Sequence, residues 1–377
     1  MRVITAGESH GKGLFAILEG VPAGLKLDLG KINARLALRQ KGYGRGARQK
    51  LEADSAEILS GVRNLVTLGS PVTVAVWNRD YENWKEYMAP EGCDTDAKRL
   101  TAVRPGHADL TGVKKFAHDD ARNVLERASA RETAVRVAAG EILRALLSEL
   151  GVSVTGYVRA AAGIADTNEY TFEEIEKNRS EILGMLDSEA EKKACAVIDD
   201  CHGAGDTCGG VIELRVKGLK SGFGSCMSYA EKLDARLTAA LMSVQAIKGV
   251  EVGLGFEAGS RFGSAVHDEI TYSAAQGYSR KTNNAGGIEG GMSNGEELVL
   301  RAAMKPIPTL MKGLDTVDIA TNEPVHAAAE RSDVCAILAA EVVLEAALIT
   351  ELAKVVLERL GGDNLQELAE RYGRLPQ

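Results

Sequence analysis

The stretch SARETAVRVAAGEILRALLSEL, residues 129–150, carries the clearest helical pattern in the chain. Ser129 and Glu132 fit a capping box, which satisfies free backbone amides at a helix start. Gly151 follows as a typical helix terminator. The apolar residues at helical spacing are Val135, Ala138, Ile142, Leu146 and Leu150. We therefore predict one long helix over residues 129–150.

Strand and helix patterns alternate irregularly on both sides of this helix. The chain before it predicts a hairpin of strands 1–6 and 14–21, a helix at 31–40 with Ile32, Leu36 and Leu38 inward, and strands at 58–62 and 71–77. The chain after it predicts strands at 210–216, 250–256 and 298–304, a helix at 229–248, and a helical region at 324–360 with a break near 349–350. This order favours an α+β fold with antiparallel sheets over a parallel βαβ sheet. The sequence has no repeat and no long linker, and the polar segments 79–100 and 164–194 resemble surface excursions, so we expect one domain over residues 1–377.

Composition excludes several classes of protein. The 377 residues carry a net charge of −8, which argues against a general nucleic-acid coat. The N-terminus has no signal-peptide core, and no apolar stretch reaches the roughly 20 residues of a membrane span, so we expect a cytoplasmic protein. The six cysteines show no C-x-x-C spacing, which favours reduced thiols. A partial metal site at Cys201, His202 and Cys208 is the weaker alternative, because a fourth ligand is missing, and we expect no metal.

The charge is unevenly distributed. Residues 31–51 hold seven basic residues and no acidic one, and 41–50 predict a mobile, glycine-rich loop. Arginine binds carboxylate and phosphate oxygens in pairs, and a helix start adds free amides, so Arg127-Ala128-Ser129 predicts a phosphate cradle. A solvated basic face is the alternative, against which the surrounding glycines argue. The candidate arginines are Arg39, Arg45, Arg48, Arg104, Arg127, Arg131 and Arg331.

Two histidines stand beside glycine in turn sequences, Ser9-His10-Gly11 and Gly106-His107-Ala108. Histidine exchanges protons near neutral pH, although a structural role remains an equal alternative for both. The glycine-rich stretch 286–295 has neither dinucleotide-binding nor phosphate-loop spacing, and Lys305-Pro306-Ile307-Pro308-Thr309 follows it with a cation. The residues together predict an enzyme that holds a small, multiply anionic, phosphorylated substrate.

Six of these motifs in order resemble the chorismate synthase family, from residue 7 to residue 333. They are Gly7 to Gly11, Arg104 to Asp109, Glu126 to Thr133, Gly286 to Gly295, Lys305 to Thr309 and Arg331-Ser332-Asp333. The resemblance implies the conversion of 5-enolpyruvylshikimate 3-phosphate to chorismate and phosphate, a 1,4-anti elimination that needs reduced FMN. It also implies a β-α-β sandwich of antiparallel sheets around central helices and a homotetramer. Bifunctional members carry their own NADP-linked flavin reductase activity, and we expect the monofunctional kind, because no separate dinucleotide-binding domain is evident.

The resemblance also implies roles for individual residues. His10 would protonate the leaving phosphate, His107 would protonate the reduced flavin, and Asp333 would help flavin N5 to remove the substrate's C6 proton. The residues implied in substrate binding are Ser9, Arg39, Arg45, Arg48, Arg104, Arg131 and Arg331. Those implied in FMN binding are Arg127, Ala128, Ser129, Gln245, Ala246, Gly290, Lys305, Pro306, Ile307, Pro308, Thr309 and Arg331. The family usually has serine at position 128, so Ala128 removes one hydroxyl that a flavin would contact.

Two other functions compete with this one. A catalytically inactive flavin- or anion-binding homologue is opposed by the joint presence of His10, His107 and Asp333. A nucleic-acid-binding protein that uses residues 31–50 is opposed by the acidic total and by the lack of aromatic residues interleaved in that segment.

Overall fold

Two long helices, α5 (Thr133–Glu149) and α9 (Ile337–Leu360), pack side by side in the centre of the protein. The computed structural model describes residues 1–46, 53–275, 277–327 and 332–376. A Cβ added to Gly140 of α5 would lie 2.6 Å from the Cβ of Ala346 in α9. Glycine at this position therefore allows the two helices to approach this closely.

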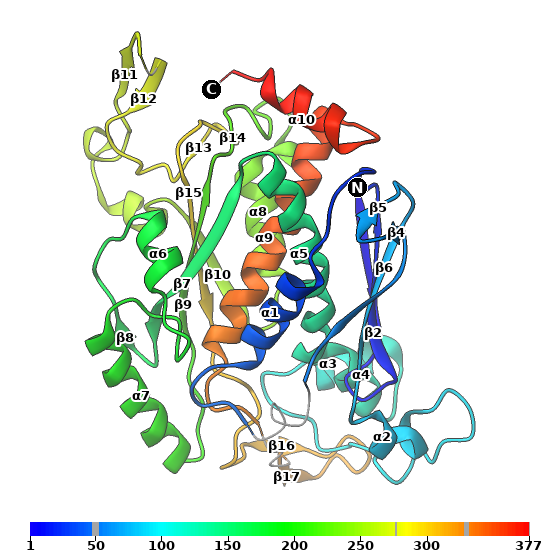
Figure 1. Cartoon of the computed structure of the whole chain (residues 1–377). Coiled ribbons are helices and arrows are strands. Elements are labelled where there is room, and N and C mark those ends of the chain that lie inside the picture. Colours follow the sequence, from blue (N-terminus) through cyan, green and yellow to red (C-terminus); the bar gives the residue numbers. More distant parts are fainter. Residues whose placement is uncertain (47–52, 276, 328–331, 377) are drawn as a thin grey trace.

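An antiparallel sheet covers each side of these helices (Figure 1). The four-stranded sheet has the order β1 (Arg2–Ala6), β2 (Gly13–Glu19), β6 (Val72–Trp77), β3 (Ala56–Ser60). The five-stranded sheet has the order β10 (Ile247–Val252), β15 (Leu298–Met304), β9 (Gly210–Lys217), β7 (Ser153–Ala161), β8 (Ile164–Ala165). Helix α5 packs on β2 and β6, and α9 packs on β7 and β9. The predicted α+β sandwich of antiparallel sheets around central helices is confirmed.

Other elements complete and surround these layers. Helix α1 (Leu29–Gln40) contacts both α5 and α9, and α8 (Leu233–Met242) and α10 (Leu365–Gly373) pack on α9. The outer helices are α2 (Tyr81–Met88), α3 (Asp109–Phe116), α4 (Arg122–Ala128), α6 (Phe172–Asn178) and α7 (Ser188–Gly203). The short strands pair as β4 (Val62–Arg63) with β5 (Val66–Thr67), β11 (Ile270–Ser273) with β12 (Gly277–Arg280), β13 (Ile288–Glu289) with β14 (Met292–Ser293), and β16 (Asp315–Val317) with β17 (Pro324–His326). The β11–β12 hairpin projects from the body at the upper left of Figure 1.

One large apolar core joins both sheets to the central helices, and a small second cluster lies around Val103 and Val124. Because the large core draws residues from Leu14 to Tyr372, we propose that residues 1–377 form a single domain. Within the described ranges, no helix is both long enough and apolar enough to span a membrane.

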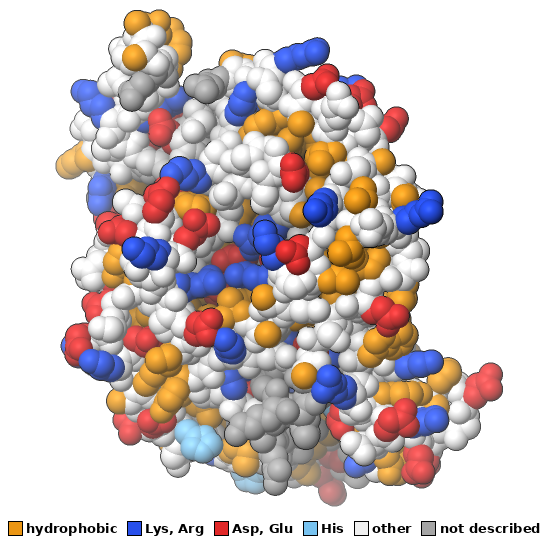
Figure 2. Space-filling model, in the orientation of Figure 1, with side chains coloured by type: hydrophobic (Ala, Val, Ile, Leu, Met, Phe, Trp, Pro, Cys, Tyr) orange, Lys and Arg blue, Asp and Glu red, His pale blue; other side chains and the backbone are white. Residues whose placement is uncertain are grey.

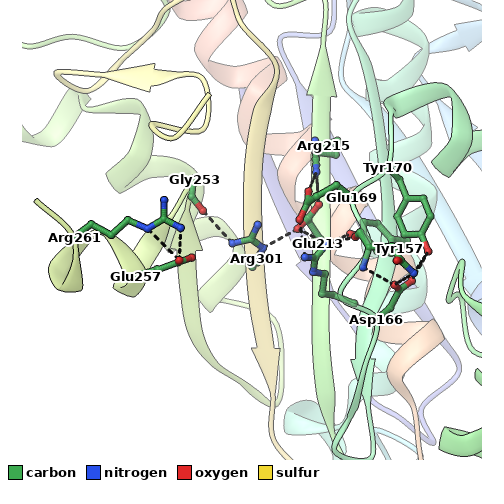
Figure 3. A network of polar contacts seen from close by, with 12 residues as sticks. Tyr157, Asp166, Glu169, Tyr170, Glu213, Arg215, Gly253, Glu257, Arg261 and Arg301 are labelled. Carbon is green, nitrogen blue, oxygen red and sulfur yellow. Dashed lines mark hydrogen bonds and ion pairs between the residues drawn. The ribbon is translucent and has the colours of Figure 1, made fainter. Parts of the chain in front are cut away.

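The outer face of the five-stranded sheet carries a buried polar network (Figure 3). Along β9, Ile212 and Leu214 face the core, and Glu213 between them faces away, as the period-2 alternation of a strand requires. Glu213 is fully buried and accepts hydrogen bonds from Arg215 at 2.8 Å and Arg301 at 2.7 Å. Burial acts to raise the pKa of Glu213, but the two arginines hold that pKa below its ordinary value.

The predicted strands of both sheets are confirmed with small shifts at their ends, except that the strand predicted at 250–256 is displaced. It spans Ile247–Val252 instead, and Gly255–Ser260 form a 3₁₀ helix. The helix predicted at 31–40 is also confirmed, with Ile32 and Leu36 buried and Leu38 half-buried. The segment 164–194 is more than a surface excursion, because Phe172 and Ile175 of α6 are buried.

Three helix predictions are wrong at their boundaries. Residues Ala130–Glu132 form a 3₁₀ turn before α5, and Ser129 accepts a hydrogen bond from the Arg131 amide, so there is no capping box. The helix predicted at 229–248 ends at Met242, because the chain turns through Ala246, whose φ of 70° is left-handed, into β10. The helix predicted over 324–360 begins only at Ile337. No break occurs at 349–350, where the helix is continuous and the Thr350 hydroxyl donates to the Ala346 carbonyl oxygen.

Candidate active site

A cavity of about 570 Å³ lies at the N-terminal ends of α5 and α9. Thr133 at the start of α5 lines it, as do Ala336, just before α9, and Ala339, Ala340 and Val343 in the first turns of α9. Helix N-termini carry free amides and partial positive charge, so the two helices favour an anion in this cavity. Its volume is in the range of sites for small molecules and cofactors.

Most of the predicted site residues lie on the wall of this cavity, although they come from distant parts of the chain. These are Ser9, His10, Arg39, Arg45, Arg104, His107, Ala128, Ser129, Arg131, Gln245, Ala246, Lys305, Ile307, Pro308, Thr309 and Asp333.

Three predicted residues do not line the cavity. The guanidinium of Arg127 donates instead to the carbonyl oxygens of Thr5 and Gly7. Gly290 lies in the turn between β13 and β14, and Pro306 lies between two lining residues without joining them. Arg48 and Arg331, which the sequence also predicts, fall outside the described residues.

His10 lies in the loop after β1 and is held by Glu126 of α4. The Glu126 carboxylate is 2.9 Å from His10 Nδ1 and accepts a hydrogen bond of 2.9 Å from the His10 backbone amide. Trp84 of α2 stacks on the imidazole with ring centroids 3.9 Å apart. Burial acts to raise the pKa of Glu126, but the hydrogen bonds from His10 hold it below its ordinary value.

His107 lies just before α3 and contacts a carboxylate in the same way. Its Nδ1 hydrogen-bonds to Asp109, a fully buried residue that also accepts from the backbone amide and the guanidinium of Arg104. Burial acts to raise the pKa of Asp109, but hydrogen bonds from His107 and Arg104 keep it well below its ordinary value. Both histidines therefore place Nδ1 against a buried carboxylate whose own pKa lies below its ordinary value.

The cavity arginines are buried and paired with carboxylates. Arg131 lies 2.6 Å from Asp54, and Arg39 lies 3.5 Å from the same carboxylate. Burial lowers the pKa of Arg39 to about 10, so its guanidinium remains charged at neutral pH. Arg45 lies 3.2 Å from Asp333, whose other oxygen accepts the Gly46 amide at 2.6 Å.

The opposite wall is formed by Gln245, Ala246 and residues 305–309. The Lys305 amide donates to the Ala246 carbonyl oxygen at 2.9 Å, and its ammonium donates to the Gly106 carbonyl oxygen at 2.5 Å. Gln245 donates through Nε2 to Glu132 at 3.0 Å, which leaves its Oε1 buried with no hydrogen-bond partner among the described residues. This wall therefore consists of backbone segments held together by hydrogen bonds and one buried acceptor, Gln245 Oε1, that a ligand could bind.

Sequence reasoning missed the acidic partners Asp54, Asp109 and Glu126, and it missed Trp84. Asp109 stands two residues after His107, and Glu126 stands four after Arg122, so both had a local signal in the spacing of opposite charges. Asp54 and Trp84 had none, because their contacts are with residues far along the chain.

The structure shows no metal site among the residues it describes, since no group of three or more His, Cys, Asp or Glu side chains there could hold a metal ion. This includes Cys201, His202 and Cys208.

The sandwich fold and its cationic, histidine-bearing cavity define an α+β enzyme that acts on a small anionic molecule. The model of the family described as "Chorismate synthase" matches residues 1–357. The chain is 50% identical to chorismate synthase of Caldicellulosiruptor bescii, over 100% of this chain and 99% of that protein. It is 53% identical to chorismate synthase of Geobacter sulfurreducens, over 99% and 97%. The crystal structure of a chorismate synthase superposes with a TM-score of 0.80 at 40% identity, covering 99% of this chain and 96% of that one. The chain therefore belongs to the chorismate synthase family, whose members are carbon–oxygen lyases.

Proposed function

We propose that this enzyme converts 5-enolpyruvylshikimate 3-phosphate to chorismate and phosphate by a 1,4-anti elimination that depends on reduced FMN. This is the last shared step of aromatic amino acid biosynthesis, in the shikimate pathway. One observation carries the proposal: a single cavity combines buried arginines with two histidines that are each bound to an ionised carboxylate. An inactive homologue gains no support, because His10, His107 and Asp333 all line that cavity.

The substrate carries two carboxylates and a phosphate, which require several cations for charge balance. Arg39, Arg45, Arg104 and Arg131 supply them from four parts of the chain, and the starts of α5 and α9 add partial positive charge. In this proposal Ser9, Arg48 and Arg331 complete the set that binds the substrate.

The cavity also fits a flavin. Gln245 Oε1, a buried polar atom without a hydrogen-bond partner within the described ranges, would meet the hydrogen-bonding edge of such a cofactor. We assign FMN binding to the lining residues Ala128, Ser129, Gln245, Ala246, Lys305, Ile307, Pro308 and Thr309, together with Arg127, Gly290, Pro306 and Arg331.

The proton transfers belong to three side chains of this chain. Expulsion of phosphate needs an acid, and His10 would donate that proton. When bound, reduced FMN would supply a basic nitrogen, N5, for removal of the substrate's C6 proton. Asp333 would assist at that position as a base, and the Arg45 guanidinium lies 3.2 Å from its carboxylate. His107 would hold the proton that sets the protonation state of the flavin.

We further propose a cytoplasmic homotetramer that receives FMN already reduced. The exposed side chains of Phe256, Phe262, Tyr272 and Tyr278 on and near the β11–β12 hairpin support assembly, because a monomer seldom exposes so many large apolar groups together.

The test is an anaerobic assay with reduced FMN and 5-enolpyruvylshikimate 3-phosphate. We expect equal amounts of phosphate and chorismate, and no product when FMN is omitted. His10→Ala and His107→Ala should each slow turnover by about 10²–10⁴-fold, the usual effect of losing a general acid. Absence of both products from the wild-type enzyme would refute the proposed reaction, and near wild-type rates in both variants would refute the histidine roles.

A further inference from the structure

His10 is held by two contacts on its imidazole and one on its backbone amide. Glu126 Oε1 lies 2.9 Å from Nδ1, and Glu126 Oε2 accepts the His10 backbone amide at 2.9 Å. Trp84 stacks on the ring at an interplanar angle of 24°. Within the part of the chain that the structure describes, Nε2 makes no hydrogen bond, and His10 lines the cavity.

We propose that Glu126 is the positioning residue for His10: its carboxylate keeps a proton on Nδ1, so that Nε2 is the atom that delivers a proton into the cavity. This inference rests on the proposed function, in which His10 is the acid. It adds a residue that touches neither substrate nor cofactor and acts only through the imidazole.

An ionised carboxylate can only accept hydrogen bonds, so it selects the form of histidine that donates from Nδ1. Arg122, one helical turn before Glu126, lies 3.2 Å from the carboxylate and favours its charged form. Glu126 itself is only 2% exposed, so water does not compete for its oxygens. With Nδ1 bonded to the carboxylate, Nε2 is the ring nitrogen left to exchange a proton with the cavity.

The same residue ties the loop through its backbone, because the Ser9 amide donates to the Glu126 carbonyl oxygen at 2.8 Å. A substitution of the side chain leaves this bond in place, so Glu126→Gln is expected to keep the loop folded. Asp109 offers no equally clean test, because Arg104 also depends on its carboxylate for the local fold.

The first experiment compares Glu126→Gln with the wild type in the anaerobic assay. We expect kcat to fall by about 10²-fold or more, as when an orienting carboxylate is removed from a catalytic histidine, with KM for the substrate within about threefold. Glu126→Asp, which keeps the charge, should recover part of the loss. Asp119→Asn, at a side chain that is 85% exposed, serves as the matched control and should leave turnover unchanged.

The second experiment is a double-mutant cycle with His10→Ala. If Glu126 acts only through His10, the His10→Ala/Glu126→Gln enzyme should be no slower than His10→Ala. An additive loss in the double variant, or a Glu126→Gln enzyme within twofold of wild type, would overturn the proposal.

Nitrogen NMR of histidine-labelled protein separates this inference from the proposed function, since it needs no turnover. We expect the His10 signals to show Nδ1 protonated in the wild type and a mixture of ring forms in Glu126→Gln. Identical signals in the two proteins would overturn the positioning role even if the enzyme makes chorismate. A wild type that makes no chorismate but shows the expected signals would refute the reaction and leave the positioning role supported.

Discussion

At the scale of single residues, the arginines of the cavity are paired with carboxylates of the protein itself. Asp54 forms ion pairs with both Arg39 and Arg131, and Asp333 forms one with Arg45. Buried ion pairs hold the arginines in fixed positions, so little reorganisation is needed when an anionic substrate arrives.

Arg45→Ala is expected to weaken substrate binding more than FMN binding. It removes one charged contact, which is worth about 1.5–3 kcal/mol, so KM should rise by about 10–100-fold. Titration of the enzyme with each ligand separately measures both effects, and Lys41→Ala, at an exposed neighbour, is the control. A larger loss for FMN would place Arg45 on the cofactor.

Ala128→Ser is expected to tighten FMN binding. The added hydroxyl would face the cavity and supply one neutral hydrogen bond, worth about 0.5–1.5 kcal/mol, which corresponds to roughly 2–10-fold in Kd. Quenching of flavin fluorescence measures the change. Unchanged or weaker FMN affinity would show that the flavin lies away from residue 128.

At the scale of elements, the three packed helices α1, α5 and α9 are joined by buried charges. Glu345 of α9 accepts hydrogen bonds from Arg35 of α1 and Arg144 of α5. Basic side chains gather near the middle of the face shown in Figure 2. Lys31, Arg35, Arg144 and Arg179 line a cavity of about 320 Å³ with Glu345. The helices are thus fixed relative to one another by charge as well as by apolar contact.

Glu345→Gln is expected to lower the free energy of unfolding by about 3–5 kcal/mol, because it removes the buried charge that Arg35, Arg144 and Arg179 share. Urea unfolding followed by circular dichroism measures the loss. Glu181→Gln, at a side chain that is 68% exposed and pairs with Lys41, should cost less than about 1 kcal/mol. Equal effects of the two substitutions would contradict a structural role for the buried network.

Helices and strands were predictable where their apolar pattern was long and regular, as in α5 and β15. The start of α9 was not, because the predicted helical region reached back to Pro324, and Pro324–His326 form β17 instead. The end of α8 was not predictable either. The turn from α8 into β10 depends on the left-handed backbone of Ala246, a conformation that alanine adopts only at a cost in free energy.

At the scale of the whole molecule, several carboxylates with lowered pKa values link stability to pH. They lie in the cavity, between the helices and on the outer sheet: Asp109, Glu126, Glu345 and Glu213. A carboxylate with a lowered folded pKa stabilises the fold fully above its unfolded pKa, near 4, and this contribution is lost as the pH falls through the folded value. Burial raises the pKa of Glu341, so that group acts in the opposite direction.

The free energy of unfolding should therefore fall as the pH drops below about 4, since the carboxylates with lowered pKa values outnumber those with raised values, Glu297 and Glu341. Urea titrations at pH 7, 5, 4 and 3 measure the trend. The Glu345→Gln variant should lose less stability over this range than the wild type. A wild type whose stability is flat down to pH 3 would contradict the ionised state of these carboxylates.

The sequence predicted the sandwich fold and most of the residues that line the cavity. Two kinds of sequence signal identified those residues. His10, His107 and Asp333 stand in recognisable motifs, and the arginines form a local excess of positive charge. Glu126 binds His10 across 116 positions of sequence, and Asp54 binds Arg131 across 77. Such pairs are created by tertiary folding, so no local sequence pattern predicts that the two residues are in contact.

The wall that α9 presents to the cavity has a consequence for inhibitor design. Ala336, Ala339 and Ala340 offer only methyl groups there, whereas Arg39, Arg45, Arg104 and Arg131 make another side of the cavity dense in charge. An inhibitor extended toward α9 with an apolar group would gain affinity from buried area, at about 25 cal/mol per Å², without a further anionic group. Added negative charge hinders the entry of an inhibitor into cells. An apolar extension toward α9 would therefore raise affinity without the loss of uptake that a further anionic group, aimed at the arginines, would cause.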